Sequence, residues 1–276
     1  MDKKTKDRTC DNSSSKGSIC IVGIGPGGIE HLTFKAKETL ENSDVVVGYK
    51  TYIDLIKRLI PNKEIFSTGM TREVDRCQKA IELALQGKKV AVVSSGDAGI
   101  YGMAGLVLEL LQGAGVRGQG SEGKNKSQIS NLKSQISIIP GVPAFCAAAS
   151  LLGAPLMHDF ASISLSDLLT PWETIKKRLE MTSISDFVTI LYNPKSKTRI
   201  SQLEEAIAII SSHRKENTPV GIVKNATRKK EEIKITTLKE MPSHYDFIDM
   251  TTIVIIGNSA TFIANGKIIT PRGYDV

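Results

Sequence analysis

The segment Val90–Gly102 holds the residue types and spacing that point most directly to ligand chemistry. A short β-branched run there ends abruptly in the small and polar string SSGDAG. Gly96 and Gly99 lack side chains, so a ligand can approach the backbone, and Asp97 supplies a fixed hydrogen-bond acceptor. An ordinary turn, with Asp97 capping a helix that begins at Ile100, is the alternative interpretation.

A second glycine-rich turn follows the first predicted strand. Gly23, Gly25 and Gly28 satisfy G-x-G-x-x-G, the spacing of a dinucleotide-binding turn. Such a site also needs an acidic residue at the end of the second strand, to bind the ribose hydroxyls, but that strand ends in VGY. Pro26 removes one backbone N–H that a pyrophosphate would use. The turn therefore favours a flat or hydrophobic ligand, and an NAD-dependent oxidoreductase remains the alternative.

Strands alternate with helices through the first half of the chain. The apolar patterns predict strands over 19–23, 44–48, 64–67, 90–93 and 136–139, with helices around 32–40, 52–60, 71–86 and 100–111. In the helix over 71–86, Val74 and Cys77 are expected to face inward. This alternation predicts a parallel sheet with right-handed crossovers, whose ligand turns lie at the carboxyl ends of the strands.

The pattern changes after Pro140–Pro143. Strands are predicted over 162–165, 186–192, 220–223, 232–236 and 251–256, with helices over 144–152 and 171–180 and around 203–210. More strands per helix favour a mixed sheet, so the sequence predicts α/β domains over 18–140 and 141–276. Residues 1–17 are expected to form a disordered tail. Residues 113–135, rich in Gly, Ser, Asn and Lys, are expected to be a low-complexity surface insertion.

Composition excludes several classes of protein. The 276 residues are 41% hydrophobic, and no apolar run approaches the roughly 20 residues that span a bilayer. The four cysteines are scattered, which argues against disulfides and a zinc site and favours a reducing, cytoplasmic compartment. Of the net charge of +7, most comes from 1–17 and 113–135, so the folded body gives little support for nucleic-acid binding.

The turns after the predicted strands also carry a family resemblance. Gly23–Gly27, Ser95–Gly102 and Pro140–Ala144 resemble the signatures of the tetrapyrrole (corrin/porphyrin) methylases, which use S-adenosyl-L-methionine. The following stretches resemble more narrowly the precorrin-3B C17-methyltransferases of cobalamin (vitamin B12) and porphyrin-type biosynthesis: His158–Ala161, Ser164–Trp172, Leu191–Pro194 with Ser196 and Arg199, Ile256–Ser259 and Thr270–Tyr274. Ala98 and Pro143 depart from the family pattern, where Pro and Thr are common.

The resemblance implies a class III methyltransferase fold: two α/β domains, the N-terminal one with a mainly parallel sheet and the C-terminal one with a mixed sheet, and a cofactor cleft between them. It further implies a homodimer without a bound metal. By motif position, the residues expected to bind S-adenosyl-L-methionine, and its product S-adenosyl-L-homocysteine, are Pro26, Ser95, Gly96, Asp97, Ile100, Pro143, Ala144, Tyr192, Asn193, Ala226 and Thr251.

The family's substrate implies a second set of residues. A tetrapyrrole with acetate and propionate groups needs cations, and the candidates for contacting it are Arg72, Tyr101, Lys195, Arg199 and Arg228, with Lys197 and Lys224 as further cations. His158 and Asp159 are the catalytic candidates, because they could assist the ring contraction that accompanies C17 methylation in this family. Capping of a loop is the alternative role for that pair.

The expected reaction is methyl transfer to C17 of precorrin-3B or cobalt-precorrin-3. Methylation of another corrin position, C11 or C20, is the alternative within the family. A non-catalytic tetrapyrrole carrier is the alternative outside enzyme chemistry. The sequence leaves open whether the acceptor contains cobalt.

Overall fold

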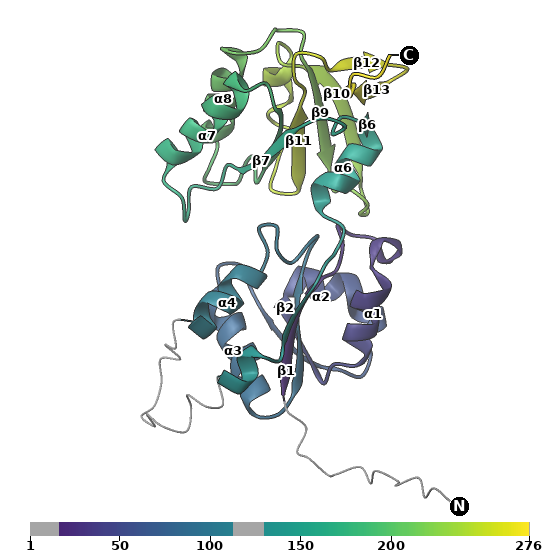
Figure 1. Cartoon of the computed structure of the whole chain (residues 1–276), viewed down its shortest axis with the longest axis vertical. Helices are drawn as coiled ribbons and strands as arrows, with labels where there is room; N and C mark the ends of the chain where they lie inside the picture. The colour runs from purple at the N-terminus through teal and green to yellow at the C-terminus, as the bar shows by residue number, and fades with distance from the viewer. Residues whose placement is uncertain (1–16, 113–129, 276) are drawn as a thin grey trace, which may run out of the picture. The chain divides into compact units, whose positions relative to one another are not determined.

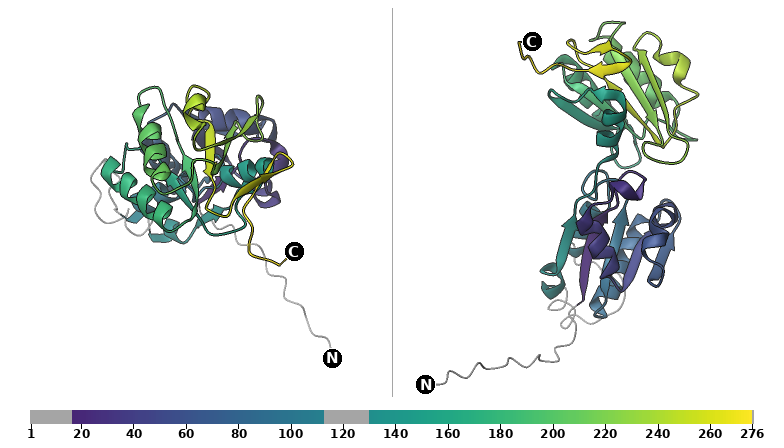
Figure 2. Two further views of the ribbon diagram at one scale, coloured as in Figure 1. Left: turned by 90° about the horizontal axis from the view of Figure 1, so that it is seen from above. Right: turned by 90° about the vertical axis from the view of Figure 1, so that its right-hand side faces the viewer.

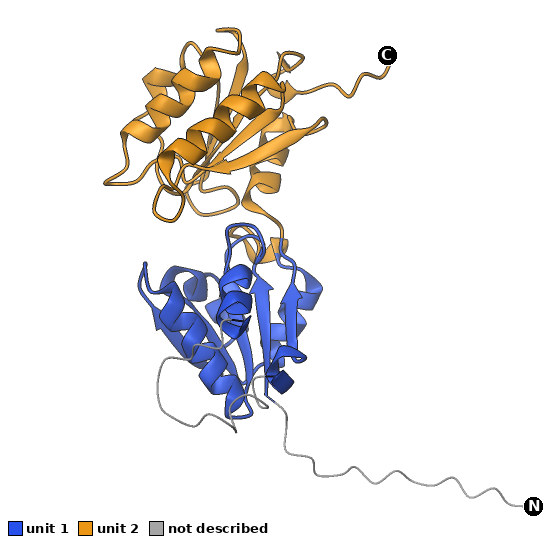
Figure 3. Cartoon of the chain, turned by 60° about the vertical axis from the view of Figure 1, so that its left-hand side comes forward, with its two compact units in different colours: residues 1–24, 32–141 blue, residues 25–31, 142–276 orange. Residues whose placement is uncertain are grey.

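The computed structural model describes residues 17–112 and 130–275, which form two compact units (Figures 1 and 3). The first unit comprises residues 17–24, 32–112 and 130–141, and the second comprises 25–31 and 142–275. The short segment 25–31 therefore packs with the second unit, although the elements on either side of it belong to the first. Most of the predicted tail and of the predicted insertion lies outside the described residues.

The first unit is built on a five-stranded parallel sheet in the order β3-β2-β4-β1-β5. The strands are β1 (Ser18–Gly23), β2 (Val45–Tyr49), β3 (Glu64–Thr68), β4 (Lys89–Ser94) and β5 (Ile136–Ile139). The helices are α1 (Phe34–Glu41), α2 (Lys50–Ile56), α3 (Glu73–Leu85) and α4 (Ala104–Gln112), with a short 3-10 turn at Lys57–Leu59; the 3-10 turn Ile29–His31 lies in the segment 25–31 of the second unit. This confirms the parallel sheet expected from the alternation of strands and helices.

Alternate residues of the strands pack against different helices. Ile21 and Val92 join the core under α3 and α4, whereas Val22 and Val93 join the core under α1 and α2 (Figure 1). Because both faces of the sheet are covered, every residue of these strands gains from being apolar, and the runs read as continuously hydrophobic. The sheet thereby fixes the turns that follow its strands.

Three details of the first unit differ from the sequence expectation. The helix predicted from Ile100 begins at Ala104, because Tyr101 adopts a φ of 52° and Ala98 O accepts the Ala104 N–H at 3.0 Å. Residues 130–133, predicted to belong to an insertion, are helical, and Leu132 is packed into the core with only 4% exposure. Val74, expected to face inward, is exposed.

The second unit has a mixed five-stranded sheet in the order β10-β9-β11-β8-β7. Its strands are β7 (Phe160–Ser164), β8 (Val188–Tyr192), β9 (Pro219–Lys224), β10 (Glu232–Thr237) and β11 (Thr252–Ile256). Only β7 and β8 are parallel neighbours, and the other three pairs are antiparallel. The mixed sheet predicted for this half is therefore confirmed.

Helices cover both faces of the second sheet (Figure 2). The long helices α7 (Trp172–Ile184) and α8 (Ser201–Ser211) pack with Leu191, Ile222 and Val254 in one core. On the other face, α6 (Ala144–Leu152) lies against β9 and β11. A Cβ on Gly221 would come within 2.3 Å of Leu152, so the glycine permits this close approach.

The remaining elements of the second unit are short. A 3-10 turn spans Met241–His244, and β12 (Phe262–Ala264), β13 (Lys267–Ile269) and β6 (Gly153–Ala154) form a small three-stranded sheet. The sequence did not predict this small sheet, because two or three residues are too few to establish an alternating pattern.

Candidate active site

Three turns meet at the carboxyl ends of β1, β4 and β5, which we call the first loop edge. The strand register aligns Gly23 with Ser94, and Ile24 N donates to Ser94 O at 2.9 Å. A Cβ built on Gly141 would lie 2.2 Å from Gly96 O and 2.7 Å from Gly23 O. The backbones of Gly23, Gly96 and Gly141 are therefore in direct contact. Gly23 and Gly141 lack side chains because the neighbouring turns pack against them, not because they leave open space for a ligand.

Asp97 joins two of these turns. Its Oδ1 accepts the Gly99 N–H at 2.8 Å, and its Oδ2 accepts the Gly141 N–H at 3.0 Å. The alternative interpretation of Asp97 as a helix cap is wrong, because α4 begins at Ala104, beyond the reach of that carboxylate's two bonds. Each carboxylate oxygen has a second lone pair, so Asp97 keeps the capacity to accept a bond from a ligand.

The accessible part of the first loop edge is the turn after β4. Ser95, Asp97 and Ile100 are partly exposed and Gly99 is exposed, whereas Gly96 is buried with a φ of 67°. Tyr101 is 53% exposed. The structure thus brings together the candidate residues of this half except Pro26, which belongs to the second unit, and Arg72, which follows β3.

Arg72 and its neighbour Arg76 shape the turn after β3. Arg72 is exposed and forms an ion pair with Asp75. Arg76, which sequence reasoning missed, is only 3% exposed, and its Nη1 donates to Thr68 Oγ1 at 2.6 Å and to Gly69 O at 2.8 Å. The available signal was its position one helical turn before Ala80 on the buried face of α3.

The second unit has an equivalent edge, which we call the second loop edge. The carboxyl ends of β7, β8 and β9 and the amino end of β11 lie there, since Ser164 aligns with Tyr192 and Lys224 with Thr252. Asn193 and Asn225 follow β8 and β9 directly, with φ values of 49° and 53°. Asparagine tolerates this left-handed conformation better than other non-glycine residues, so both turns begin as soon as the strand ends.

Side chains and backbone connect the candidate residues of this edge. Tyr192 Oη accepts the Phe145 N–H at 3.2 Å, which places the amino end of α6, with Pro143 and Ala144, beside β8. Asn193 Nδ2 donates to Ser164 Oγ at 2.9 Å. Asn225 N donates to Thr251 O at 3.1 Å, next to the buried Ala226. The structure therefore gathers the candidates Pro143, Ala144, Tyr192, Asn193, Ala226 and Thr251 at one edge.

The cations expected to bind substrate mostly bind the protein itself. Lys195 Nζ donates to Tyr245 O at 2.9 Å, and Lys224 Nζ donates to Phe247 O at 3.2 Å and pairs with Asp249 at 2.8 Å. The guanidinium of Arg199 donates to Asn193 O at 2.6 Å. These three cations hold the turn after β8 and the segment 245–249.

Arg199 departs furthest from its expected role. It is 9% exposed, and burial lowers the pKa of its guanidinium, with nearby Asp167 opposing that shift. Its Nε has no partner among the described residues. A buried guanidinium that already binds Asn193 O is poorly placed to meet carboxylates of a large substrate, so the expected direct contact with substrate is not supported.

His158 and Asp159 lie at the opposite edge of the second sheet. They precede β7, and Val188 N, at the start of β8, donates to Asp159 O at 3.1 Å. Five steps of extended strand, about 17 Å, separate Asp159 from Ser164 at the second loop edge. His158 Nδ1 accepts the Asp159 N–H at 2.8 Å, which is a local capping contact. The structure does not bring this predicted catalytic pair together with the other candidates.

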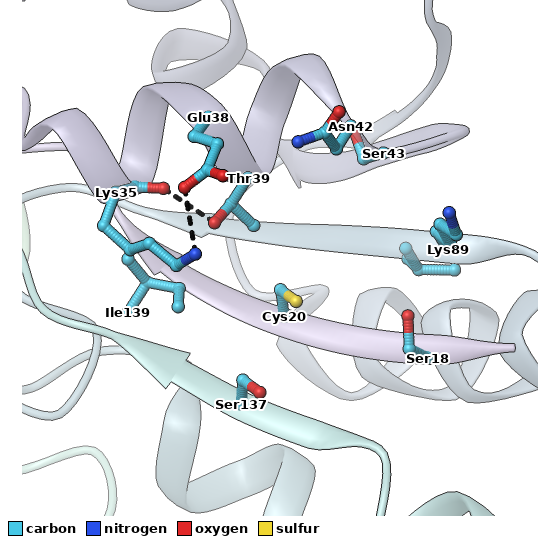
Figure 4. A pocket seen from close by; sticks show the side chains of 11 residues that line it. Ser18, Cys20, Lys35, Glu38, Thr39, Asn42, Ser43, Lys89, Ser137 and Ile139 are labelled. Atoms are coloured by element: carbon cyan, nitrogen blue, oxygen red, sulfur yellow. Dashed lines mark hydrogen bonds and ion pairs between the residues drawn. The ribbon is translucent and has the colours of Figure 1, made fainter. Parts of the chain in front are cut away.

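Several hollows lined by described residues lie away from the loop edges. One, of about 360 Å³, is lined by His158, Asp159 and Arg272. Another, of about 230 Å³, lies between α1 and the face of the first sheet, where Lys35 pairs with Glu38 above Cys20 and Ser137 (Figure 4). Neither of these two hollows is lined by a candidate cofactor residue, so neither marks the candidate site.

Comparison with known proteins identifies the family. The model of the Tetrapyrrole (Corrin/Porphyrin) Methylases matches residues 18–242, which include both loop edges except for residues 245–252. The chain belongs to the tetrapyrrole methylases. The match covers most of the chain and agrees with the resemblance carried by the glycine and proline turns.

Several curated proteins are similar in sequence to this tetrapyrrole methylase over most of its length. A "Probable cobalt-factor III C(17)-methyltransferase" of Salmonella typhimurium is 49% identical over 93% of this chain and 99% of that protein. A "Cobalt-factor III methyltransferase" of Priestia megaterium is also 49% identical over 94% of this chain, which spans only 45% of that longer protein. A "Precorrin-3B C(17)-methyltransferase" of a Sinorhizobium species is 36% identical over 94% of this chain and 97% of that protein.

Solved structures share the fold of this methylase. The crystal structure of the methyltransferase CobJ matches 92% of this chain and 100% of its own with a TM-score of 0.81 and 32% identity. A uroporphyrin-III C-methyl transferase from Thermus thermophilus, complexed with S-adenosyl homocysteine, matches 87% of this chain and 97% of its own with a TM-score of 0.63 and 20% identity. The second likeness concerns the fold alone. The α/β class predicted from the sequence is thus confirmed.

Other kinds of site receive no support in the part of the methylase that the structure describes. No group of three or more His, Cys, Asp or Glu side chains there could hold a metal ion, and no helix there is long and apolar enough to cross a membrane. Burial raises the pKa of Cys77 to about 12, Arg76 opposes that shift and Glu73 adds to it, and the side chain is fully buried, so nothing here favours this thiol as a nucleophile.

Proposed function

We propose that this tetrapyrrole methylase transfers a methyl group from S-adenosyl-L-methionine to C17 of a precorrin-3-type tetrapyrrole, with ring contraction, in cobalamin biosynthesis. The 49% identity to the Salmonella protein over 93% of this chain and 99% of that one carries the proposal. Identity is lower, 36%, to the relative named for precorrin-3B, which favours the cobalt-containing acceptor. We further propose that the protein works in the cytoplasm as a homodimer.

The chemistry of the two loop edges fits the methyl donor. At the first, Asp97 keeps lone pairs for hydroxyl or ammonium donors beside the exposed backbone of Gly99. At the second, the centroid of the Tyr192 ring lies 6.4 Å from that of the Phe145 ring. These aromatic rings can offer an apolar surface to a base or a thioether.

When bound, S-adenosyl-L-methionine supplies an electrophilic methyl group on a sulfonium, and displacement of that group requires an in-line approach of the acceptor carbon. The residues of this chain have to position the donor and exclude water. Asp97 fixes the turns after β4 and β5 relative to one another, and Arg199 fixes the turn after β8 through Asn193 O. A strong catalytic base is dispensable, because the carbon of a reduced tetrapyrrole is already electron-rich.

The carboxylates of the substrate need cations that are not already committed to the protein. Arg72 and Lys197 are exposed at the turns after β3 and β8. We propose that these two, rather than the buried Arg199, meet the acidic side groups. An exposed ion pair such as Arg72 with Asp75 is worth little, so the guanidinium can exchange its partner for a substrate carboxylate.

The decisive experiment incubates the purified protein with S-adenosyl-L-methionine and either cobalt-factor III or precorrin-3B. We expect a product heavier by one methyl group, placed at C17 by NMR, and faster turnover of the cobalt form. Methylation at C11 or C20 would reassign the acceptor position, and tight NADH binding without S-adenosyl-L-homocysteine binding would favour the oxidoreductase. Light scattering of the same sample tests the dimer.

Asp97 provides the sharpest single variant for the cofactor. We expect Asp97→Ala to lower the affinity for S-adenosyl-L-homocysteine at least about tenfold, because an acceptor and the connection between two turns are both lost. Glu82→Gln, which changes an exposed carboxylate paired with Lys79 on α3, is the matched control. Calorimetry measures both affinities, and unchanged binding by Asp97→Ala would remove Asp97 from the site.

A further inference from the structure

Within the second unit, Arg228 contacts Pro26 and Gly27 of the segment 25–31. Its Nε donates to Pro26 O at 2.6 Å, across 202 positions of sequence. Pro26 is buried, so its carbonyl depends on a protein donor in place of water. The sequence suggested Arg228 as a cation for substrate carboxylates, but the structure directs its Nε to the backbone of a candidate cofactor turn.

The neighbouring glycine gives independent evidence of this contact. A Cβ on Gly27 would lie 2.3 Å from Cγ of Arg228 and 3.0 Å from Thr227 O. The glycine is therefore explained by the close approach of the Arg228 stem, not by a need for left-handed backbone, since Gly27 is absent from the positive-φ glycines. The turn and the arginine fit each other through both packing and a hydrogen bond.

The loop that carries Arg228 is held in an unusual conformation. Asn225, Thr227 and Lys230 all have positive φ values, of 53°, 60° and 64°. Arg228 N donates to Asn225 O at 2.8 Å, and Thr227 N donates to Glu231 Oε2 at 2.7 Å. Three non-glycine residues in the left-handed region are strained, and such strain persists where the surrounding contacts determine the conformation.

We propose that Arg228 is a positioning residue for the donor site: it holds the Pro26–Gly27 turn in the conformation that receives S-adenosyl-L-methionine. This inference rests on the proposed function, and it replaces the role of Arg228 as a substrate cation. Arg228 acts through the bond from its Nε to Pro26 O and through the packing of its Cγ against Gly27. Two variants separate these contributions.

Arg228→Met keeps Cγ and removes the donor, whereas Arg228→Ala removes both. Lys229→Ala, an exposed neighbour in the same loop, is the matched control. We expect Arg228→Met to raise KM for S-adenosyl-L-methionine about tenfold, with kcat and KM for the tetrapyrrole within about twofold of the parent. The reverse split, with KM raised only for the tetrapyrrole, would show that Arg228 binds substrate and would overturn the proposal.

A double-mutant cycle with Gly27 tests the packing contact. Gly27→Ala should weaken binding of S-adenosyl-L-homocysteine about tenfold in the parent and in Arg228→Met, because the Cγ that its Cβ meets is present in both. In Arg228→Ala that Cγ is absent, so the additional loss should shrink to about twofold, from the remaining contact with Thr227 O. Equal losses in all three backgrounds would contradict the contact.

Hydrogen exchange separates failure of this inference from failure of the proposed function. Exchange in the peptide covering 25–31 should speed up in Arg228→Met and Arg228→Ala relative to Lys229→Ala, while exchange in β1 stays unchanged. This readout needs no ligand. A parent protein that fails to bind S-adenosyl-L-homocysteine would refute the donor site, and unchanged exchange at 25–31 in both Arg228 variants would refute the positioning role.

Discussion

The two loop edges of this methylase are held in place by different means. At the first, backbone packs against backbone: a Cβ on Gly141 would meet Gly96 O at 2.2 Å, and a single carboxylate, Asp97, bridges two turns. At the second, cations reach main-chain carbonyls, as Lys195 does with Tyr245 O and Arg199 with Asn193 O. The first edge is thus constrained by space and the second by charge and hydrogen bonding.

The topology of the two sheets explains the difference. In the parallel sheet, β1, β4 and β5 are neighbours that end together, so their turns are crowded and only small residues fit. In the mixed sheet, β8 and β9 are separated by the antiparallel β11, so the turns at their carboxyl ends lie further apart. Long side chains such as Lys and Arg span that distance. Steric changes should therefore damage the first edge most, and charge changes the second.

The largest effect is expected from Gly141→Ala. The new Cβ would meet Gly96 O and Gly23 O, which are backbone atoms and cannot move aside as a flexible side chain can. We expect a loss of about 3 kcal/mol in the free energy of unfolding, at the upper end of overpacking penalties. Urea unfolding at neutral pH measures it, and added salt should leave the loss unchanged.

Gly105→Ala is the control for that substitution. Gly105 is an exposed residue of α4, and a Cβ added to it would have nothing within 4 Å. Alanine there should stabilise the protein by about 0.5–1 kcal/mol, because glycine loses more entropy in a helix. A Gly141→Ala protein as stable as the parent would show that the first loop edge is not sterically constrained.

A smaller effect is expected from Asp249→Asn at the second loop edge. Burial alone would raise the pKa of Asp249, but hydrogen bonds from Lys224 Nζ and Thr251 outweigh it, and the pKa lies below its ordinary value. A carboxyl group with a lowered folded-state pKa stabilises the protein above its unfolded pKa, about 3.9. That contribution is lost as pH falls through the folded-state value.

Asparagine keeps Oδ1 for Thr251, but it removes the charge and replaces Oδ2, the partner of Lys224 Nζ, by an NH2 donor. Because Asp249 is nearly half exposed, solvent screens the pair, and we expect a loss of about 0.5 kcal/mol at pH 7. The difference between variant and parent should shrink as the pH falls below about 3.9 toward the lowered folded-state pKa of Asp249, and it should also shrink in high salt. Asp246→Asn, whose fully exposed carboxylate is 3.9 Å from Lys195, should have no effect. A loss for Asp249→Asn that stays the same at every pH below about 3.9 would argue against the charge.

The sequence predicted elements and turns well where a local pattern determines them. The bounds of α6 were predicted as Ala144–Leu152, because small and apolar residues follow a proline there. The sequence could not predict hydrogen bonds between residues that are far apart in the chain. Nothing near Asp97 indicates a bond to Gly141, 44 residues away, and nothing near Arg228 indicates Pro26. Residue type identified Arg199 and Lys195 as cations, but only the fold decides whether a cation meets substrate or a carbonyl.

The smallest effect is expected from His158→Ala. His158 lies at the edge of the second sheet opposite the second loop edge, so this variant can be compared with one at the loop edge. His158 is 48% exposed, and its described bond is to the backbone of its neighbour Asp159. Turnover should therefore stay within about twofold of the parent, as for surface substitutions in general. Tyr192→Phe, at the second loop edge, removes the acceptor of the Phe145 N–H and should weaken donor binding more than His158→Ala does.

Magnitude decides between the two roles of His158. A general acid or base contributes about 10²- to 10⁴-fold to a rate, whereas a loop cap contributes only to stability. The position of His158 before β7, a strand's length from Ser164, favours the cap. A hundredfold fall in turnover for His158→Ala, with the free energy of unfolding unchanged, would show that His158 and Asp159 take part in the reaction. The catalytic site would then extend to the edge of the second sheet that precedes β7.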